Sequence, residues 1–332
     1  MKHIVSFSGG RTSAYLVYLM EKKRKAEGLD VEYIFCDTGA EHPKTYEFIR
    51  NVINHFGIKL TCLRGNFNQP IGDGLTVDVV SIDEIGHNLI NGPFAQLMRK
   101  YGTPTVAAAW CTTRMKEDVA NKYFFMMGYD KRKQYLGMRT DEPARYFGLK
   151  AWQILRKHQY PNYELHRLFN EARSGSDLKD WWLTGGAREL IVERVKSLDE
   201  KGIHYLAELE EVEKQDVLDF WKLQPFDLEI DEHLGNCVFC IKKSVNKVAL
   251  AMRDEEELLT AWKLAIDNGS DRLSAANGID KGVMYRGNSS IETIEQQFSE
   301  LSRDELKDTI RSMRDTHPCA ESCEPFGQID LF

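Results

Sequence analysis

The feature that most constrains this chain is a short apolar run that breaks into a serine- and glycine-rich turn just before a helical stretch. The run is Ile4–Phe7, and helical residues continue from Ala14 to Lys25. Glycine opens backbone conformations closed to other residues, and N–H groups at a helix N-terminus favour an anion. An ordinary strand-to-helix turn with a serine N-cap is the alternative interpretation. The turn predicts a phosphate cradle formed by Ser8, Gly9, Gly10, Arg11, Thr12 and Ser13.

Composition limits the class of protein. The chain has 332 residues, of which 42% are hydrophobic, so one enlarged domain or two can bury a core. No apolar run approaches the roughly 18 residues of a membrane span, and the N-terminus lacks a signal-peptide apolar region. We therefore expect a cytoplasmic protein with no membrane partner. The net charge of −7 argues against a globally basic nucleic-acid binder but permits a local basic groove, with candidates Arg145, Lys150, Arg156, Lys157 and Arg167.

The first half of the chain alternates β-branched or apolar runs with helical patterns, which indicates βαβ units and a parallel sheet. Strands are predicted at 3–7, 31–36, 58–63, 77–80 and 133–138, and helices at 13–27, 43–55, 81–101 and 112–128. The fold class is therefore α/β, a Rossmann-like parallel sheet flanked by helices. Ligands of such sheets bind beyond the carboxyl ends of the strands, so the residues that follow each strand are the site candidates.

The domain organisation changes after the βα rhythm stops. We predict a nucleotide-binding core at 1–150, a helical insertion or lid at 151–203, and a helical, cysteine-containing C-terminal region at 204–332. In that last region the clearest helical pieces are Val212–Trp221 and Val245–Asp267.

Two further blocks follow predicted strands. The first places Asp37, Thr38, Gly39 and Glu41 at the sheet edge, where a nucleotide on the first loop would lie. The second contains Gly137, Arg139, Asp141, Glu142 and Arg145. Arginines suit phosphate oxygens, whereas the acids suit a divalent cation or a ribose. Polar turns and a solvated charged loop are the alternative interpretations.

Seven cysteines, an odd number at scattered spacing, fit thiols or metal ligands better than a disulfide framework. Cys237 and Cys240 have the two-residue spacing that lets both thiolates bind one metal or cluster. Cys36 and Cys62 lie in predicted strands, and we expect both to be buried.

The three strand-end blocks, in this order, resemble the PP-loop ATP pyrophosphatases, in their phosphoadenosine phosphosulfate (PAPS) reductase-like branch. Residues 8–13 resemble the family's Ser-Gly-Gly-Lys-Asp-Ser loop, 35–45 its Asp-Thr-Gly segment with Pro-x-Thr, and 137–145 its Gly-x-Arg-x-x-Glu segment. The resemblance implies ATP on the first loop, Mg²⁺ on the phosphates, attack at the α-phosphorus and release of pyrophosphate. Nucleotide contacts are then expected from Ser8 to Ser13 and from Asp37, Thr38, Gly39, Glu41, Gly137, Arg139 and Arg145.

The catalytic residues that the resemblance implies are Arg11, Lys116, Arg139 and Glu142. Lys116 lies one turn after Cys111, where a solvated lysine is the alternative. The chain departs from the family pattern in the first loop, because Arg11 replaces a lysine and Thr12 replaces an aspartate. Asp37, Asp141 and Glu142 are the predicted substitutes for the missing carboxylate.

The resemblance also implies a [4Fe-4S] cluster, with zinc or purely structural thiols as alternatives. Cys111 resembles the cysteine that cluster-containing members place before an Arg/Lys pair, and the expected ligand set is Cys111, Cys237, Cys240 and Cys323, or Cys319 in place of Cys323.

The function expected from this resemblance is adenylation of an acceptor for sulfur insertion, as in the DNA-phosphorothioation enzymes of the Dnd and Ssp systems. Expected partners are DNA or tRNA and a cysteine desulfurase-type sulfur donor, and phage defence is a possible setting. A PAPS or adenylylsulfate reductase is a weaker interpretation, because the chain lacks that group's Glu-Cys-Gly-(Leu/Ile)-His tail. A tRNA-thiolating enzyme and a non-catalytic nucleotide sensor remain open. The sequence makes no prediction about oligomeric state.

Overall fold

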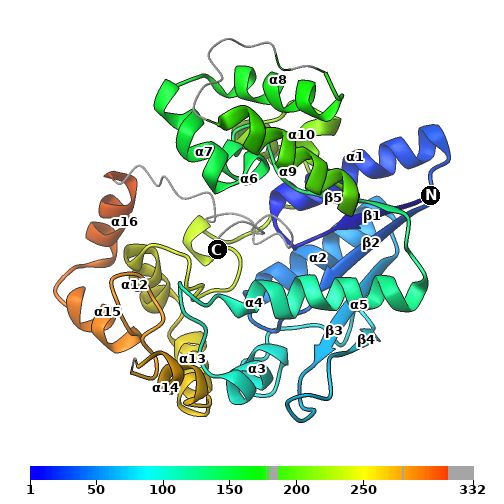
Figure 1. The fold of residues 1–332 in the computed structure, drawn as a ribbon. Helices are drawn as coiled ribbons and strands as arrows, with labels where there is room; N and C mark the ends of the chain where they lie inside the picture. Colours follow the sequence, from blue (N-terminus) through cyan, green and yellow to red (C-terminus); the bar gives the residue numbers. More distant parts are fainter. Residues whose placement is uncertain (177, 179–185, 279, 313–332) are drawn as a thin grey trace.

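A six-stranded sheet forms the centre of the computed structural model, which describes all residues except 177, 179–185, 279 and 313–332 (Figure 1). The strand order is β4-β3-β2-β1-β5-β6. Neighbouring strands are parallel except for β3 and β4. This arrangement confirms the predicted Rossmann-like α/β fold. The strands are β1 (Lys2–Ser6), β2 (Val31–Cys36), β3 (Leu60–Asn66), β4 (Thr76–Val80), β5 (Arg132–Leu136) and β6 (Ile203–Tyr205).

The antiparallel edge strand β4 has a simple cause. Only residues 67–75 connect it to β3, which is shorter than the dozen or more residues that a parallel crossover needs. The chain therefore turns back on itself, and β4 becomes the edge of the sheet beside β3.

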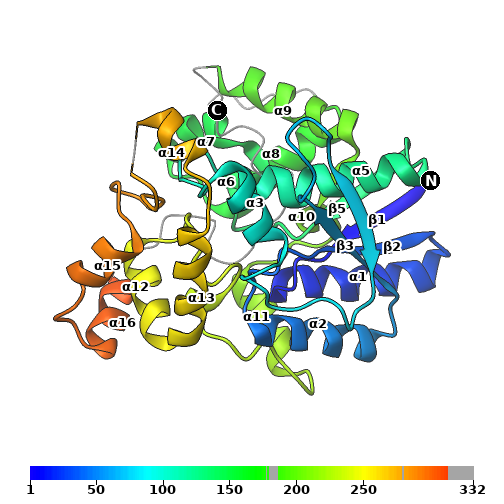
Figure 2. The same ribbon diagram turned by 90° about the horizontal axis from the view of Figure 1, so that it is seen from below.

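Helices cover both faces of the sheet because the strand residues alternate in direction. Val5, Phe35 and Cys62 pack with α1 (Arg11–Glu27), α2 (Pro43–Phe56) and α11 (Lys214–Lys222). Ile4, Ile34 and Leu63 face the other way, against α3 (Pro93–Tyr101), α5 (Asp118–Met127) and α9 (Ala187–Lys201). Figure 2 shows α1, α2 and α11 on one side of the strands and α3 and α5 on the other.

The helix predicted at 81–101 is wrong over its first half, because helix α3 begins only at Pro93. The residue before a proline is disfavoured in helical conformation, and Gly92 is held where a Cβ would lie 2.2 Å from the carbonyl oxygen of Asn88. A second helix predicted at 112–128 consists of α4 (Trp110–Thr112), a π-helical turn (Thr113–Glu117) and α5.

The insertion lies between β5 and β6 and is helical over its described residues. It contains α6 (Pro143–Phe147), α7 (Leu149–Leu155), a 3₁₀ turn (Arg156–His158), α8 (Asn162–Arg173) and α9. Strand β6, which the sequence did not predict, follows α9 directly and pairs with β5. The sheet therefore resumes after the insertion.

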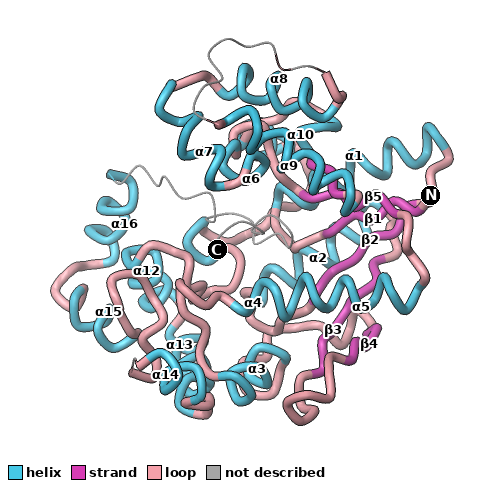
Figure 3. The backbone as a smooth tube through the Cα atoms, in the orientation of Figure 1, coloured by secondary structure: helices cyan, strands magenta, loops and turns pink. Residues whose placement is uncertain are grey.

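The C-terminal region is mostly helical, and Figure 3 shows its last helices on the opposite side of the molecule from the strands. The segment predicted at 245–267 is two helices, because Glu255 adopts φ −134° between them. The elements are α10 (Leu206–Leu209), α11, a 3₁₀ turn (Glu232–Leu234), α12 (Val245–Asp254), α13 (Glu256–Asp267), α14 (Arg272–Asn277), α15 (Ile291–Gln297) and α16 (Arg303–Ser312).

No helix among the described residues is both long enough and apolar enough to cross a lipid bilayer.

We expect the sheet core to dominate stability. Leu63 on β3 is fully buried, so Leu63→Ala should lower the free energy of unfolding by about 2–5 kcal/mol in urea titration, through lost burial and a cavity. Val79 on β4 is 60% exposed, and Val79→Ala should change the free energy of unfolding by only about 0.5 kcal/mol. Equal losses for the two variants would contradict this assignment of the core.

Candidate nucleotide site

The turn after β1 forms a compact loop at the N-terminus of α1. The Ser8 amide donates to Ser13 Oγ at 3.1 Å, and Ser13 Oγ donates to the Gly10 carbonyl at 3.0 Å. Ser13 is fully buried, so its hydroxyl holds the loop in shape. The other five predicted residues, Ser8, Gly9, Gly10, Arg11 and Thr12, line a cavity of about 240 Å³.

Gly9 is required at its position for two reasons. Its φ is +84°, in the region that side chains disfavour, and a Cβ there would lie 2.7 Å from Thr45 Cγ2. The loop therefore packs directly against the start of helix α2.

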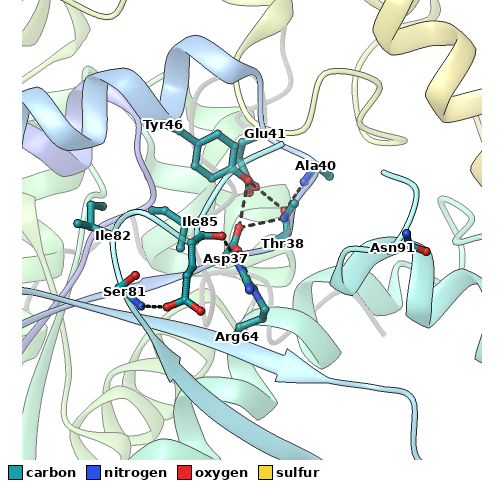
Figure 4. Close-up of polar contacts among 12 residues, drawn as sticks. Asp37, Thr38, Ala40, Glu41, Tyr46, Arg64, Ser81, Ile82, Ile85 and Asn91 are labelled. Carbon is teal, nitrogen blue, oxygen red and sulfur yellow. Dashed lines mark hydrogen bonds and ion pairs between the residues drawn. The ribbon is translucent and has the colours of Figure 1, made fainter. Parts of the chain in front are cut away.

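The segment after β2 contains a buried polar network (Figure 4). Arg64 donates to Asp37 Oδ2 through Nε at 3.0 Å and Nη2 at 2.8 Å. The Tyr46 hydroxyl and the Gly39 amide each donate to Oδ1 at 3.1 Å. Burial raises the pKa of Asp37, and Arg64 opposes that shift. With both oxygens engaged, Asp37 anchors the loop and does not line the cavity, so its contact with a nucleotide stays a prediction.

Glu41 is the carboxylate of this network that does line the cavity. Thr38 Oγ1 donates to Glu41 Oε2 at 2.5 Å, and the Tyr46 hydroxyl donates to the same atom at 3.0 Å. Lys116 Nζ lies 3.8 Å from Oε1. Lys116 is buried rather than solvated, and it comes from the π-helical turn, a distortion often found at functional sites.

Arg139, after β5, joins the loops that follow β1 and β5. Its Nη1 donates to Thr12 Oγ1 at 3.1 Å, and its Nε donates to Asp141 Oδ1 at 2.8 Å. Its amide donates to Glu142 Oε2 at 3.0 Å. Arg139 also lines the cavity, so a phosphate on the first loop would meet its guanidinium. Thr12, the departure from the family pattern, thus serves as an acceptor for Arg139.

Glu142 and Arg145 form a buried ion pair, with Nη1 donating to Oε1 at 2.6 Å. Burial alone would raise the pKa of Glu142, but Arg145 and Arg139 outweigh it and hold that pKa below its ordinary value. Neither residue lines the cavity; Glu142 contacts Arg139 and Arg145 contacts Glu142, and their predicted catalytic and nucleotide-binding roles stay predictions. Gly137 is buried just after β5.

Arg11 makes a contact that the sequence did not predict. Its Nε and Nη2 donate to the two carboxylate oxygens of Asp227 at 2.7 and 3.1 Å, and Nη2 also donates to the Leu228 carbonyl. Segment 227–236, which we call the strap, is thereby tied to the first loop. The far wall of the cavity is formed by the strap and α11, namely Lys214, Val217, Leu218, Leu228, Ile230, Asp231, Glu232, Gly235 and Asn236.

The Cys-x-x-Cys turn lies next to this cavity. Cys237 forms an antiparallel bridge with Glu41, and the Val238 amide donates to the Ala40 carbonyl at 3.3 Å. Lys243 Nζ donates to the carbonyls of His233, Cys237 and Val238 at 2.6, 3.0 and 2.8 Å, and burial lowers the pKa of Lys243 to about 8. A buried cation beside two thiols suits a thiolate-bound metal or cluster.

The structure describes only some of the predicted cluster ligands. Cys111 and Cys237 pack against the same hydrophobic core, whereas Cys319 and Cys323 lie outside the described residues. No described group of three ligands that includes Cys237 and Cys240 has its ligand atoms within 4.8 Å of one another. The Cys-x-x-Cys thiols beside Lys243 have chemistry suited to a metal or a cluster, and the preference for a [4Fe-4S] cluster over zinc stays a prediction.

Three ligand-type side chains do meet within 4.8 Å, namely Asp231, His233 and Asp254. Arg303 donates to both oxygens of Asp254, at 2.5 and 2.9 Å, and Lys307 lies 3.6 Å from Asp231. Protein cations therefore already neutralise these acids.

The remaining predictions are corrected in part. Cys62 is fully buried, but Cys36 is only partly buried, and its thiol donates to the Lys116 carbonyl at 3.7 Å. Among the basic candidates of the insertion, Arg145 is buried in its ion pair and Arg167 is paired with Glu171 at 2.6 Å. Lys150, Arg156 and Lys157 are exposed.

Comparison with known proteins supports the assignment of the first loop. Residues 2–69, which contain β1 to β3, match the phosphoadenosine phosphosulfate reductase domain. The chain is 39% identical over 336 residues to the uncharacterized nin region protein ORF290 of Escherichia phage lambda, a match covering 100% of this chain and 98% of that protein. A shorter match, 27% identical over 139 residues, links 42% of the chain to 23% of an uncharacterized protein of Methanocaldococcus jannaschii. No solved structure matches.

A PAPS reductase domain at the N-terminus supports the predicted PP-loop, PAPS reductase-like type and indicates a nucleotide-using enzyme.

The Glu142 ion pair predicts a pH dependence. Because the pKa of Glu142 is lowered in the folded state, its stabilisation is complete above the unfolded value near 4.5 and is lost as the pH falls through the folded value. Glu142→Gln should cost about 3–5 kcal/mol at pH 7, since it removes the negative charge from a buried ion pair with Arg145, and should flatten the loss of stability below pH 4.5. Urea titrations from pH 7 to pH 3 measure both effects. Glu47→Gln, an exposed change on α2, is the control, and an unchanged slope in Glu142→Gln would contradict the assignment.

Proposed function

The chain belongs to the family of the phage lambda nin region protein ORF290, and from this premise we propose that it is an ATP pyrophosphatase that adenylates an acceptor. The observation that carries the proposal is the composition of the cavity. One wall is the glycine loop with Arg139, which suits phosphates, and the opposite wall includes the apolar Val217, Leu228 and Ile230, which suit a purine face.

The proposed reaction follows from this arrangement. The triphosphate binds the loop amides at the N-terminus of α1, and Arg139 contacts its phosphate oxygens. An acceptor oxygen forms a bond to the α-phosphorus while the bond to the bridging oxygen of pyrophosphate breaks, so pyrophosphate leaves with the electron pair. Charge neutralisation on that leaving group is the main catalytic requirement, and Arg139 is placed to supply part of it. Mg²⁺ would supply further neutralisation on the phosphates when bound.

We further propose that a sulfur nucleophile then forms a bond to the activated acceptor atom while the bond to AMP breaks, so AMP leaves with the electron pair, as in DNA phosphorothioation. The Cys-x-x-Cys turn supports this proposal because its bridge to Glu41 puts thiol chemistry next to the nucleotide cavity. Cys237 and Cys240, with Cys111 and a tail cysteine, would hold the cluster. A cysteine desulfurase-type protein would deliver the sulfur.

Exposed basic side chains on the insertion support a nucleic-acid acceptor. Lys150 is exposed at the start of α7, Arg156 and Lys157 are exposed just after its end, and His158 stacks on Tyr160 with ring centroids 5.7 Å apart. Cations beside stacked rings suit a phosphate backbone with unpaired bases.

We predict that the protein converts ATP to AMP and pyrophosphate in the presence of Mg²⁺ and a DNA or tRNA acceptor. Arg139→Ala should lower kcat/KM by about 10²–10³-fold, as for removal of one transition-state donor. Arg272→Ala, at an exposed position on α14, is the matched control and should leave the rate unchanged. Chromatographic separation of the products from labelled ATP makes the measurement. Release of ADP and phosphate would refute the pyrophosphatase assignment.

The cysteine assignment has its own test. Protein purified without oxygen should carry about four irons per chain and absorb in the iron–sulfur charge-transfer region, and Cys237→Ser should lose both. Cys62→Ala is the control, because burial raises the pKa of the Cys62 thiol to about 12 and makes it a poor ligand. Colourless protein with stoichiometric zinc would contradict the cluster.

A further inference from the structure

The carboxylates predicted to replace the missing aspartate of the first loop are already occupied. Asp37 accepts two bonds from Arg64, Asp141 accepts from Arg139, and Glu142 accepts from Arg145. Of the three, none lines the cavity. A cation that bridges nucleotide phosphates therefore needs oxygen donors from another part of the cavity wall.

Glu41 provides one such oxygen. Its side chain is 2% exposed, and Thr38 and Tyr46 hold Oε2 in place. Oε1 has Lys116 Nζ at 3.8 Å, beyond hydrogen-bond range. Oε2 is thus held by two hydroxyl donors, whereas Oε1 has the long ion pair with Lys116 and belongs to a residue that lines the cavity.

Thr45 provides a second oxygen, which has no hydrogen-bond partner among the residues that the structure describes. Its Oγ1 is buried without any hydrogen bond, although the residue is 4% exposed and lines the same cavity. A buried hydroxyl left unsatisfied costs about 1–3 kcal/mol, so a partner at this point is expected. Gly9 of the first loop packs closely against Thr45 Cγ2, so Thr45 lies against that loop.

We propose that Glu41 and Thr45 form a divalent-cation site at the nucleotide cavity, which takes over the role of the carboxylate that Thr12 replaces. This inference rests on the proposed function. The donors suit Mg²⁺, which binds one or two carboxylates together with substrate phosphates and keeps waters in its other positions. A threonine or serine hydroxyl serves as a Mg²⁺ ligand beside phosphates in P-loop enzymes as well.

Lys116 makes the site dependent on the nucleotide. Its ammonium partly neutralises Glu41 and disfavours a cation in the empty cavity. Phosphates on the first loop would offset that charge, so cation and nucleotide should each tighten the binding of the other. A carboxylate that instead bound the ribose hydroxyls would contribute equally with and without metal.

The test uses Mn²⁺ as the probe, with electron paramagnetic resonance to measure bound Mn²⁺ and calorimetry to measure binding of α,β-methylene-ATP to the full chain. In the wild type, Mn²⁺ should tighten binding of the analogue by roughly 5–150-fold. Glu41→Gln and Thr45→Val should each remove most of that gain while leaving binding in EDTA close to the wild-type value. Thr45→Ser keeps the oxygen, and Glu47→Gln removes an exposed carboxylate from the same helix, so both should retain the gain.

The outcomes separate this proposal from the function on which it rests. Retention of the Mn²⁺ gain in both Glu41→Gln and Thr45→Val overturns the cation site while nucleotide binding stands. If Glu41→Gln weakens binding of the analogue equally with Mn²⁺ and with EDTA, Glu41 is assigned to the ribose, and that result also overturns the cation site. Failure of the wild type to bind the analogue under either condition contradicts the proposed function itself. Thermal melting confirms that each variant is folded. Glu41→Gln loses its charge beside Lys116, and if it does not fold, the conclusion is drawn from Thr45→Val alone.

Discussion

The contact between Arg139 and Thr12 is the interaction on which the site depends. Strands β1 and β5 are neighbours in the sheet, but the chain leaves them toward α1 and toward the insertion, so the loops beyond them separate. A crevice at such a divergence is where α/β sheets bind ligands. Arg139 spans it, with Thr12 on one side and its own loop, held by Glu142 and Arg145, on the other. A buried cation thus faces the glycine loop before any ligand arrives.

The C-terminal region completes the site. Arg11 ties the strap to the first loop through Asp227, and the strap leads directly into the Cys-x-x-Cys turn that pairs with Glu41. Lys243 then holds three carbonyls around that turn. The cavity and the Cys-x-x-Cys turn are therefore parts of one packed unit, so a change in the strap should affect both.

Local patterns were the predictable part of this protein. The parallel strands and the turn at 7–10 before α1 follow from apolar runs and glycine chemistry within a few residues, and the structure confirms them, whereas the phosphate cradle at 8–13 stays a prediction. Strand β6 has only three residues, too short for a periodic pattern. The strap has no helical or strand periodicity in its hydrophobic residues, so the sequence of 227–236 does not predict that this segment lines a cavity.

Pairing of acidic side chains with arginines explains why other predicted site residues do not line the cavity, and one of these pairs, Asp37 with Arg64, is distant in the sequence. Asp37 and Glu142 both follow strands and have suitable chemistry, but arginines, Arg64 in one case and Arg145 in the other, already occupy them. Which carboxylate faces the cavity depends on packing between elements, which sequence periodicity does not encode. Glu41 and Thr45 follow the same strand as Asp37. Only the folded structure shows that Asp37 is engaged by Arg64 and that Glu41 lines the cavity.

The central claim is that one ligand, a nucleotide, binds between the first loop and the strap. Amide hydrogen exchange with and without α,β-methylene-ATP tests it most directly, because bound ligand should slow exchange in segments far apart in sequence. The account predicts added protection at both 8–13 and 227–236 in the same titration. Protection at neither segment, or only at residues remote from the cavity, would contradict it.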